Sequence, residues 1–156
     1  GVSVGEEDHI KPAIKSLGSL EMWKVKMKPG KPLAFGQIQG TPFIGLPGNP
    51  VSAFATFNLF ARPYLMRMQG VKNICITPIW LEADFEWPKA NFRREFARAR
   101  ITVPEGEQKT VVQVYPKQGS GVLTSTVWAE GFVVIPEDQT VAKGDRVKFY
   151  PFAEMV

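Results

Sequence analysis

The first pattern along the chain is a helical one. Between Asp8 and Gly18, the apolar residues Ile10, Ile14 and Leu17 recur at helical spacing, which places them on one face of an α-helix. Aspartate is a residue type that caps the start of a helix, and glycine is one that ends it. The sequence therefore predicts a short amphipathic helix in this segment.

Strand-like patterns follow this helix. Residues 21–27, 33–38 and 41–46 are short alternating or apolar runs, and a Gln-Gly pair separates the last two. Residues 50–69 are rich in Ala, Phe, Leu and Met and indicate a longer helix. A proline inside a helix disturbs the preceding turn, so Pro63 is expected to kink it. This order of elements predicts an α/β part.

The pattern changes after Gly70, where turn residues begin to separate short β-like runs. These runs are residues 79–83, 93–103, 109–115, 122–127, 132–136 and 146–150. Many short strands at regular spacing are typical of a small β-barrel or sandwich. We therefore expect an α/β domain over residues 1–73, followed by an all-β domain over residues 74–156.

Composition limits the class of protein. Apolar residues make up 44% of the chain and charged residues 22%, as in soluble globular proteins. No apolar run reaches the roughly 18 residues that a membrane helix needs, and we find no signal-peptide pattern. Cys75 is the only cysteine and His9 the only histidine, which argues against an internal disulfide or a zinc site and favours a reducing compartment.

The positive charge is concentrated near the start of the chain. The formal net charge is +4. Residues 1–70 hold eight Lys and Arg against four Asp and Glu, whereas residues 71–156 hold eleven of each. Four of the eight cations are Lys24, Lys26, Lys28 and Lys31. This distribution favours a local anionic ligand over a broad nucleic-acid surface.

Two Pro/Gly loops carry the main candidate chemistry. The first, KPGKP, holds Lys28 and Lys31 within a turn, and the second, GLPGNPVS, ends in Ser52 where a helix is expected to begin. Paired ammonium groups, a hydroxyl and backbone N–H groups together are suited to an oxyanion. Two simpler interpretations remain open, because Lys24 and Lys26 fit a solvated strand face and the second loop fits an ordinary strand-to-helix turn.

Three further sites carry weaker signals. The first eight residues offer a serine and three carboxylates, among which Asp8 is a candidate ligand for Mg²⁺, although acidic residues also favour helix starts. Arg98 lies on one face of a predicted strand and is either an anion ligand or a solvated side chain. Ser120 lies in a flexible Gly-rich loop.

Together these blocks resemble molybdopterin molybdenumtransferase, the MoeA family, to which the E domain of gephyrin is related. The matching segments are GVSVGEED (1–8), WKVKMKPGKPLAFG (23–36), GLPGNPVSA (45–53), RREFAR (93–98), QGS (118–120) and AEGFVVIP (129–136). The resemblance covers essentially the whole chain, and the first three segments are specific as a set. It implies the second half of a three-layer, molybdopterin-binding α/β domain and the C-terminal β-barrel.

The resemblance also implies a reaction and its residues. Members of the family insert molybdate into adenylated molybdopterin with Mg²⁺ and release AMP. The residues that fall at the family's catalytic, nucleotide, metal and molybdate positions are Asp8, Lys28, Lys31, Ser3, Pro32, Pro47, Pro50, Ser52, Arg98 and Ser120. Expected partners are the small-molecule substrate, a second copy in a homodimer, and the molybdopterin adenylyltransferase, with no nucleic acid or membrane.

Family members are much longer, so we expect the chain to be a fragment that is inactive alone and exposes a sheet edge and apolar helix surface. The alternatives are a scaffold module of the gephyrin type and a nucleic-acid-binding barrel. Residues 71–156, which include the barrel segment, have no net charge, which argues against the nucleic-acid alternative.

Overall fold

A computed structural model describes residues 9–106 and 108–155. Helix α1 (Ile10–Leu17) leads directly into strand β1 (Gly18–Lys24). The predicted helix is confirmed in place, and Ile14 is its buried residue, whereas Ile10 and Leu17 are exposed. His9 occupies the N-cap position, and the cap predicted at Asp8 lies outside the described residues.

A three-stranded antiparallel sheet forms the first layer. It has the order β1-β3-β4, with β3 at Pro32–Ile38 and β4 at Thr41–Gly45. Gln39 and Gly40 both have positive φ, at 47° and 82°. Two consecutive left-handed residues are the geometry of a tight two-residue hairpin, so the turn predicted between these strands is confirmed. Both β1 and β4 are edges of this sheet, as expected.

The long helix is present but is not α-helical throughout. It consists of α2 (Pro50–Thr56), a π-helical turn (Phe57–Ala61) and α3 (Arg62–Met68). A proline ring would meet the carbonyl four residues earlier; for Pro63 that residue lies in the π-helical turn. The predicted disturbance is therefore a widened turn ahead of the proline.

The second part is a closed barrel, which confirms the predicted all-β domain. Its strands are β5 (Ile79–Ala83), β6 (Arg94–Thr102), β7 (Val111–Val114), β8 (Gly131–Ile135) and β9 (Arg146–Pro151). They run in the order β6-β7-β5-β9-β8, and pairing of β8 with β6 closes the ring. The chain ends in a 3₁₀ helix, Phe152–Met155.

One predicted strand is wrong. Residues 122–127 do not form a strand, and α4 (Thr124–Trp128) occupies the position instead. The β-branched residues in this run favour a strand. However, the hydroxyls of Ser125 and Thr126 donate hydrogen bonds to the carbonyls of Val122 and Leu123, three residues earlier. These local bonds stabilise a helical turn that side-chain pattern alone does not indicate.

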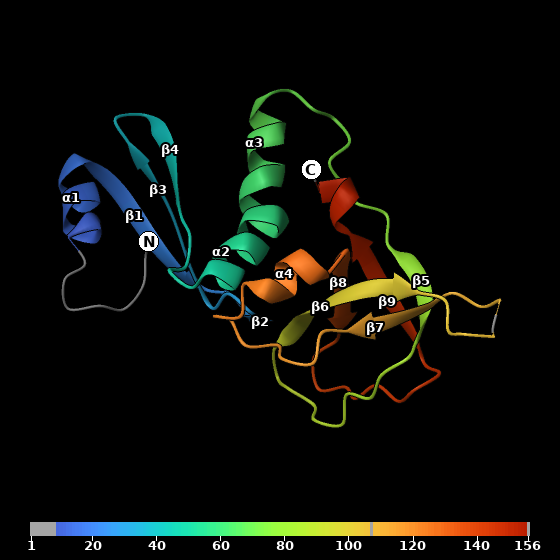
Figure 1. The fold of residues 1–156 in the computed structure, drawn as a ribbon. Helices are drawn as coiled ribbons and strands as arrows, with labels where there is room; N and C mark the ends of the chain where they lie inside the picture. The colour runs from blue at the N-terminus through green and yellow to red at the C-terminus, as the bar shows by residue number, and fades with distance from the viewer. Residues whose placement is uncertain (1–8, 107, 156) are drawn as a thin grey trace.

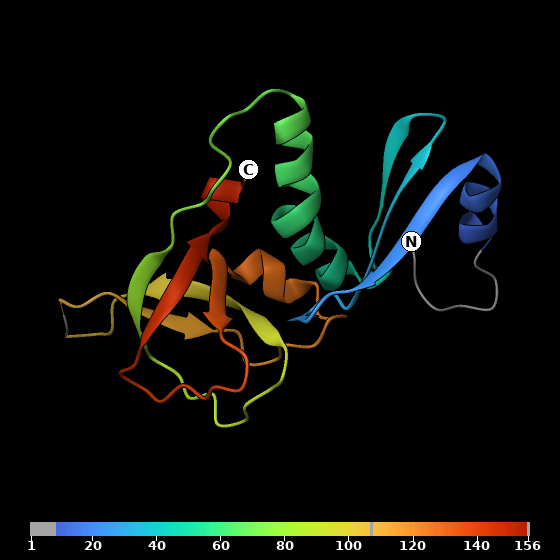
Figure 2. The ribbon, with the colours of Figure 1, turned by 180° about the vertical axis from the view of Figure 1, so that it is seen from behind.

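The helical rod, formed by α2, the π-helical turn and α3 (residues 50–68), lies between the first sheet and the barrel, as the two opposite views show (Figures 1 and 2). The predicted strand at 21–27 is split, because β1 ends at Lys24 and a separate strand β2 (Met27–Lys28) runs parallel to barrel strand β6. A buried cluster of Met27, Ala55, Phe132 and Met155 joins the two parts. The lysine segment is thus part of the junction with the barrel.

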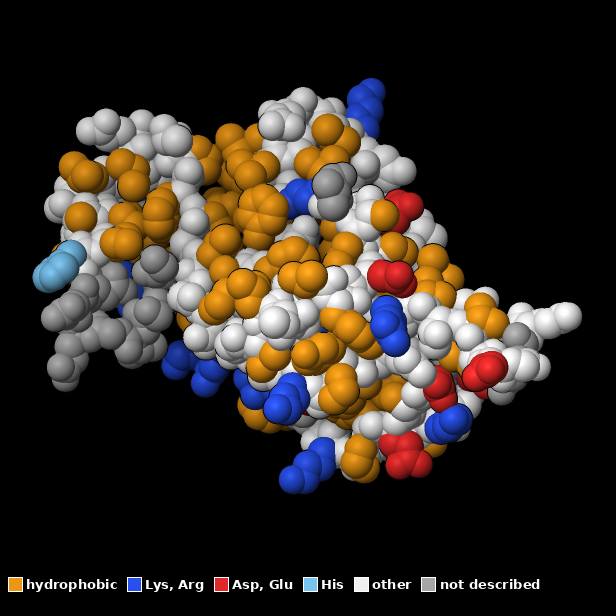
Figure 3. All heavy atoms as spheres, viewed as in Figure 1, with side chains coloured by type: hydrophobic (Ala, Val, Ile, Leu, Met, Phe, Trp, Pro, Cys, Tyr) orange, Lys and Arg blue, Asp and Glu red, His pale blue; other side chains and the backbone are white. Residues whose placement is uncertain are grey.

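The rod also exposes apolar surface, as the sequence predicts. Hydrophobic side chains gather over and beside it on the face drawn in Figure 3. The exposed large apolar residues that it carries are Phe57, Phe60, Leu65 and Met68. None of the helices within the described ranges is both long and apolar enough to cross a membrane.

Candidate functional site

A cleft of about 640 Å³ opens where three loops meet. They are the lysine loop (KPGKP, 28–32), the second Pro/Gly loop (GLPGNPVS, 45–52) and the barrel loop that holds residues 118–120. Six residues predicted from sequence line the cleft together, although they come from three separate segments. They are Lys28, Lys31, Pro32, Pro47, Ser52 and Ser120. The remaining lining residues are Pro29, Gly30, Gly48, Asn49, Arg93, Gln118 and Gly119.

Other predicted residues lie elsewhere. Pro50 is the exposed first residue of α2 and does not line this cleft. Arg98 does not line it either. Ser3 and Asp8 lie outside the described residues. The structure therefore brings together the two lysines, the two serines Ser52 and Ser120, and two of the three prolines of the prediction.

Lys28 is held at the barrel by an acidic partner. Its strand β2 pairs with β6 so that Lys28 lies opposite Glu95. The Lys28 Nζ lies 2.9 Å from the Glu95 Oε2, and the two side chains are 41% and 6% exposed. Glu95 is not among the residues predicted from sequence, because its burial and its pairing with Lys28 are not visible in the local strand pattern.

Lys31 follows a glycine that the fold requires. Gly30 has φ of +108°, and a Cβ built there would lie 2.6 Å from the Thr56 Cγ2 on the helical rod. Both conditions select glycine. The Val25 N–H donates to the Lys31 carbonyl at 2.9 Å and closes the loop. Lys31 itself is exposed, so its ammonium group is available to a ligand in the cleft.

The second loop is joined to the barrel through Ser120. The Val51 N–H donates to the Ser120 carbonyl at 3.2 Å, and the Asn49 Nδ2 donates to the Ser120 Oγ at 3.1 Å. The Ala53 N–H donates to the Asn49 carbonyl at 2.8 Å. Amides at the start of α2 are therefore already used in part by the protein. The backbone contribution expected from this helix start is smaller than the sequence indicates.

Arg98 is an organising residue of the barrel loop and is only 1% exposed. Its Nε donates to the Ser125 Oγ at 3.0 Å and its Nη2 to the Gly119 carbonyl at 3.1 Å. Burial lowers the pKa of Arg98 to about 10, so the guanidinium stays charged at neutral pH. The alternative of a solvated strand arginine is wrong, because α4 and the barrel loop cover this side chain.

Arg93 supplies a cation to the cleft that the sequence interpretation missed. It precedes β6 and lies half-buried in the cleft lining. Its Nε is buried and has no hydrogen-bond partner among the described residues. Because side chains alternate along a strand, the sequence predicts that Arg93 and Arg98 lie on opposite faces. Only the packing of the barrel against the lysine loop shows that Arg93 is the arginine that lines the cleft.

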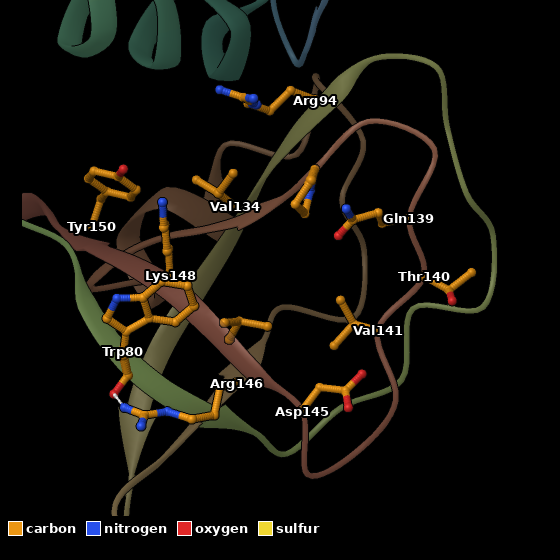
Figure 4. Close-up of a pocket in the computed structure, with 12 residues that line it drawn as sticks. Trp80, Arg94, Val134, Gln139, Thr140, Val141, Asp145, Arg146, Lys148 and Tyr150 are labelled. Atoms are coloured by element: carbon orange, nitrogen blue, oxygen red, sulfur yellow. Dashed lines mark hydrogen bonds between the residues drawn. The ribbon is translucent and has the colours of Figure 1, made fainter.

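A second groove, on the barrel alone, also carries cations (Figure 4). There the Lys148 Nζ lies 5.3 Å from the Trp80 ring centroid, and the Arg146 Nη2 donates to the Trp80 carbonyl at 3.4 Å. Arg94 is paired with Glu137 at 3.1 Å. Because these cations already have partners within the barrel, this groove is a weaker anion site than the lysine-lined cleft.

Over residues 9–106 and 108–155, no group of three or more His, Cys, Asp or Glu side chains could hold a metal ion. Glu95, the buried acid beside the cleft, is engaged by Lys28. The described residues therefore do not fit a Mg²⁺ site by themselves.

Comparisons with known proteins identify both parts of the chain. Residues 1–67 match the family described as probable molybdopterin binding domain, and residues 81–152 match the MoeA C-terminal region (domain IV). The molybdopterin molybdenumtransferase of Haemophilus influenzae is 36% identical over 158 residues, which cover 100% of this chain and 39% of that protein. The molybdenum cofactor synthesis protein cinnamon of Drosophila melanogaster is 34% identical, covering 94% of this chain and 25% of that protein.

A solved structure agrees with these sequence matches. The molybdopterin biosynthesis MoeA protein of Pyrococcus horikoshii superposes with a TM-score of 0.69 at 31% identity, over 91% of this chain and 34% of that one. The chain thus spans well under half the length of the relatives it matches.

Proposed function

Because this chain belongs to the MoeA family, we propose that it acts in molybdenum cofactor biosynthesis, at the step that inserts molybdate into adenylated molybdopterin and releases AMP. The observation that carries the proposal is the cleft in which Lys28, Lys31, Ser52 and Ser120 meet. Two ammonium groups and two hydroxyls are the donor set that a tetrahedral dianion requires.

The chemistry proposed for these residues is electrostatic. Lys28 and Lys31 offset the charge of the oxyanion, while Ser52 and Ser120 offer hydroxyl donors. The Pro/Gly loops fix these donors before the ligand arrives, so that little reorganisation is needed at the moment of reaction. Arg93 adds a third cation at the barrel side of the cleft.

Other parts of the proposal lie beyond the described residues. We place nucleotide and metal contacts at Ser3 and Asp8, with Mg²⁺ as the expected ion, and we assign no reaction step to the metal. Pro50 is proposed to shape the second loop from outside the cleft. We further propose a cytoplasmic location, a homodimer, and receipt of the adenylated substrate from the molybdopterin adenylyltransferase.

Molybdate binding tests the proposal directly. Isothermal titration of the chain with molybdate at neutral pH should give saturable binding to one site. Lys31→Met should weaken it by about tenfold or more, the loss of one charge-assisted contact. Lys24→Met is the matched control, because Lys24 is an exposed strand lysine that does not line the cleft. Equal affinity of the Lys31 variant and the unmodified chain would refute this use of the cleft.

The scaffold alternative of the gephyrin type is not favoured. It requires a groove that accepts a peptide, whereas the cleft between the two parts carries Lys28, Lys31 and Arg93. A cation-rich cleft favours a small anion over an apolar peptide segment.

A further inference from the structure

The charge of the cleft is not simply the sum of its cations, because one of them is paired. Lys28 contacts Glu95 at 2.9 Å. Lys31 and Arg93 form no ion pair with any residue in the described ranges. The cleft therefore combines one cation that is held by an acid with two that are not.

Glu95 lies behind Lys28 with respect to a ligand. The glutamate is 5% exposed and is not among the lining residues, whereas Lys28 lines the cleft and is 41% exposed on its side chain. The ammonium group therefore lies between the carboxylate and the open space. A ligand would contact the ammonium without touching the acid, but it would still feel the negative charge behind it.

We propose that Glu95 sets the charge selectivity of the cleft. As the counter-charge of Lys28, it lowers the affinity for dianionic oxyanions more than for monoanionic ones, and so keeps the ligand exchangeable. This inference rests on the proposed function, since it assumes that the cleft accepts a molybdate-like anion. Nothing in the sequence pattern distinguishes Glu95 from a surface acid; its burial and its pairing with Lys28 do.

The expected size follows from Coulomb's law. A bound oxygen and the carboxylate are separated by about 6 Å, two hydrogen bonds of about 2.9 Å in line. Repulsion at that distance is worth about threefold in affinity per unit of ligand charge in bulk water, and more at lower dielectric. Because the cleft is open to water, we expect removal of the Glu95 charge to raise the affinity for a monoanion about threefold and the affinity for a dianion about tenfold.

Two tetrahedral oxyanions of different charge separate this effect from a structural one. Molybdate is the dianion and perrhenate the monoanion. The affinity of each is measured by titration calorimetry for the unmodified chain, for Glu95→Gln and for Glu95→Ala. Both variants remove the charge, and the alanine variant keeps the test available if the glutamine variant folds poorly; thermal unfolding by circular dichroism monitors folding.

Charge-matched controls accompany these variants. Glu95→Asp keeps the charge and should keep the ratio of molybdate to perrhenate affinity. Glu137→Gln removes a carboxylate that is paired with Arg94 and lies outside the cleft lining, and it should leave both affinities unchanged. If the role of Glu95 were merely structural, its replacement would weaken the binding of both anions alike and would not raise the ratio of molybdate to perrhenate affinity.

The outcomes distinguish the two proposals. Tighter molybdate binding with a raised molybdate-to-perrhenate ratio in the neutral Glu95 variants supports the inference. If the unmodified chain binds molybdate and the neutral variants bind it equally or more weakly, the inference fails and the proposed function stands. If neither anion binds to any of these proteins, both are overturned. Binding to the neutral variants alone would support the role of Glu95.

Discussion

Replacing Arg98 separates two roles that an arginine near an anion cleft can have. The guanidinium donates to the Ser125 Oγ at 3.0 Å and to the Gly119 carbonyl at 3.1 Å. Its backbone N–H and carbonyl are both bonded to the Gln118 amide, at 2.9 Å each. Arg98 thus holds the loop that ends in Ser120, and we expect it to act on the cleft through this loop.

The expected cost is the difference between two opposing effects. Two hydrogen bonds from a charged group contribute about 3 to 6 kcal/mol. Burial opposes them, because lowering the pKa of Arg98 to about 10 corresponds to a desolvation cost of about 3 kcal/mol. Arg98→Met removes both effects and should lower the free energy of unfolding by about 2 kcal/mol, or about 4–8 °C in Tm.

Arg98→Lys gives the discriminating result. A lysine keeps the buried charge, but its ammonium lacks the planar fork that reaches two acceptors at once. It therefore retains the desolvation cost while losing part of the hydrogen bonding, and it should destabilise the chain at least as much as methionine does. Molybdate affinity should fall in both variants, because Ser120 is held less firmly.

Urea denaturation and molybdate titration of both variants provide the measurement. Arg100→Met is the control, since Arg100 lies two residues further along the strand and is exposed. Its guanidinium carbon lies 4.5 Å from the centroid of the Trp128 ring. This substitution should cost under about 1 kcal/mol and leave molybdate binding intact. A lysine variant with the stability and molybdate affinity of the unmodified chain would refute this reasoning. It would indicate that the charge of residue 98, and not its hydrogen bonds to the loop, is what the cleft requires.

Three further predictions concern the supports of the cleft and the barrel. Gly30→Ala should lower the free energy of unfolding by about 1–3 kcal/mol, measured in urea, because of its positive φ and the nearby Thr56 methyl. Met27→Ala should cost about 2–5 kcal/mol and also weaken molybdate binding, because this buried residue fixes β2 to the barrel. The pKa of Asp84 is lowered, chiefly by a hydrogen bond from Lys143; this stabilisation is complete above the unfolded value of about 3.9 and is lost as pH falls through the lower folded value. Asp84→Asn should therefore flatten the acid limb of a stability–pH curve, and an unchanged limb would contradict the assignment.

The parts of the fold that the sequence predicts are those decided by local chemistry. The Gln39-Gly40 turn is an example, since the glycine at its second position readily adopts the positive φ that a tight hairpin requires. The Lys28 and Lys31 loop is another, because proline restricts its own φ and glycine permits the positive φ found at Gly30. Both are confirmed as elements of the structure.

The parts that the sequence does not predict are decided by tertiary packing. Glu95 and Arg98 lie on one strand, and the pattern leaves Arg98 as either an anion ligand or a solvated side chain and gives no sign that Glu95 is buried. Both are buried, because β2 pairs beside Glu95 and the barrel loop covers Arg98. The exchange of roles between Arg98 and Arg93 has the same cause. Which side of a barrel strand is covered depends on segments distant in sequence. The alternation of residues along the strand does not show where those segments pack.

The cleft is a product of the junction between the two parts. Lys28 stands on β2, which belongs in sequence to the α/β part but pairs with barrel strand β6. Ser120 stands on a barrel loop, yet it is bonded to the amide and the side chain of the second Pro/Gly loop. Each part therefore fixes a ligand-facing residue of the other. A barrel separated from residues 22–52 would keep its closed sheet but lose Lys28, Lys31 and the partners of Ser120. Anion binding should therefore require both parts, because each part contains only some of the donors.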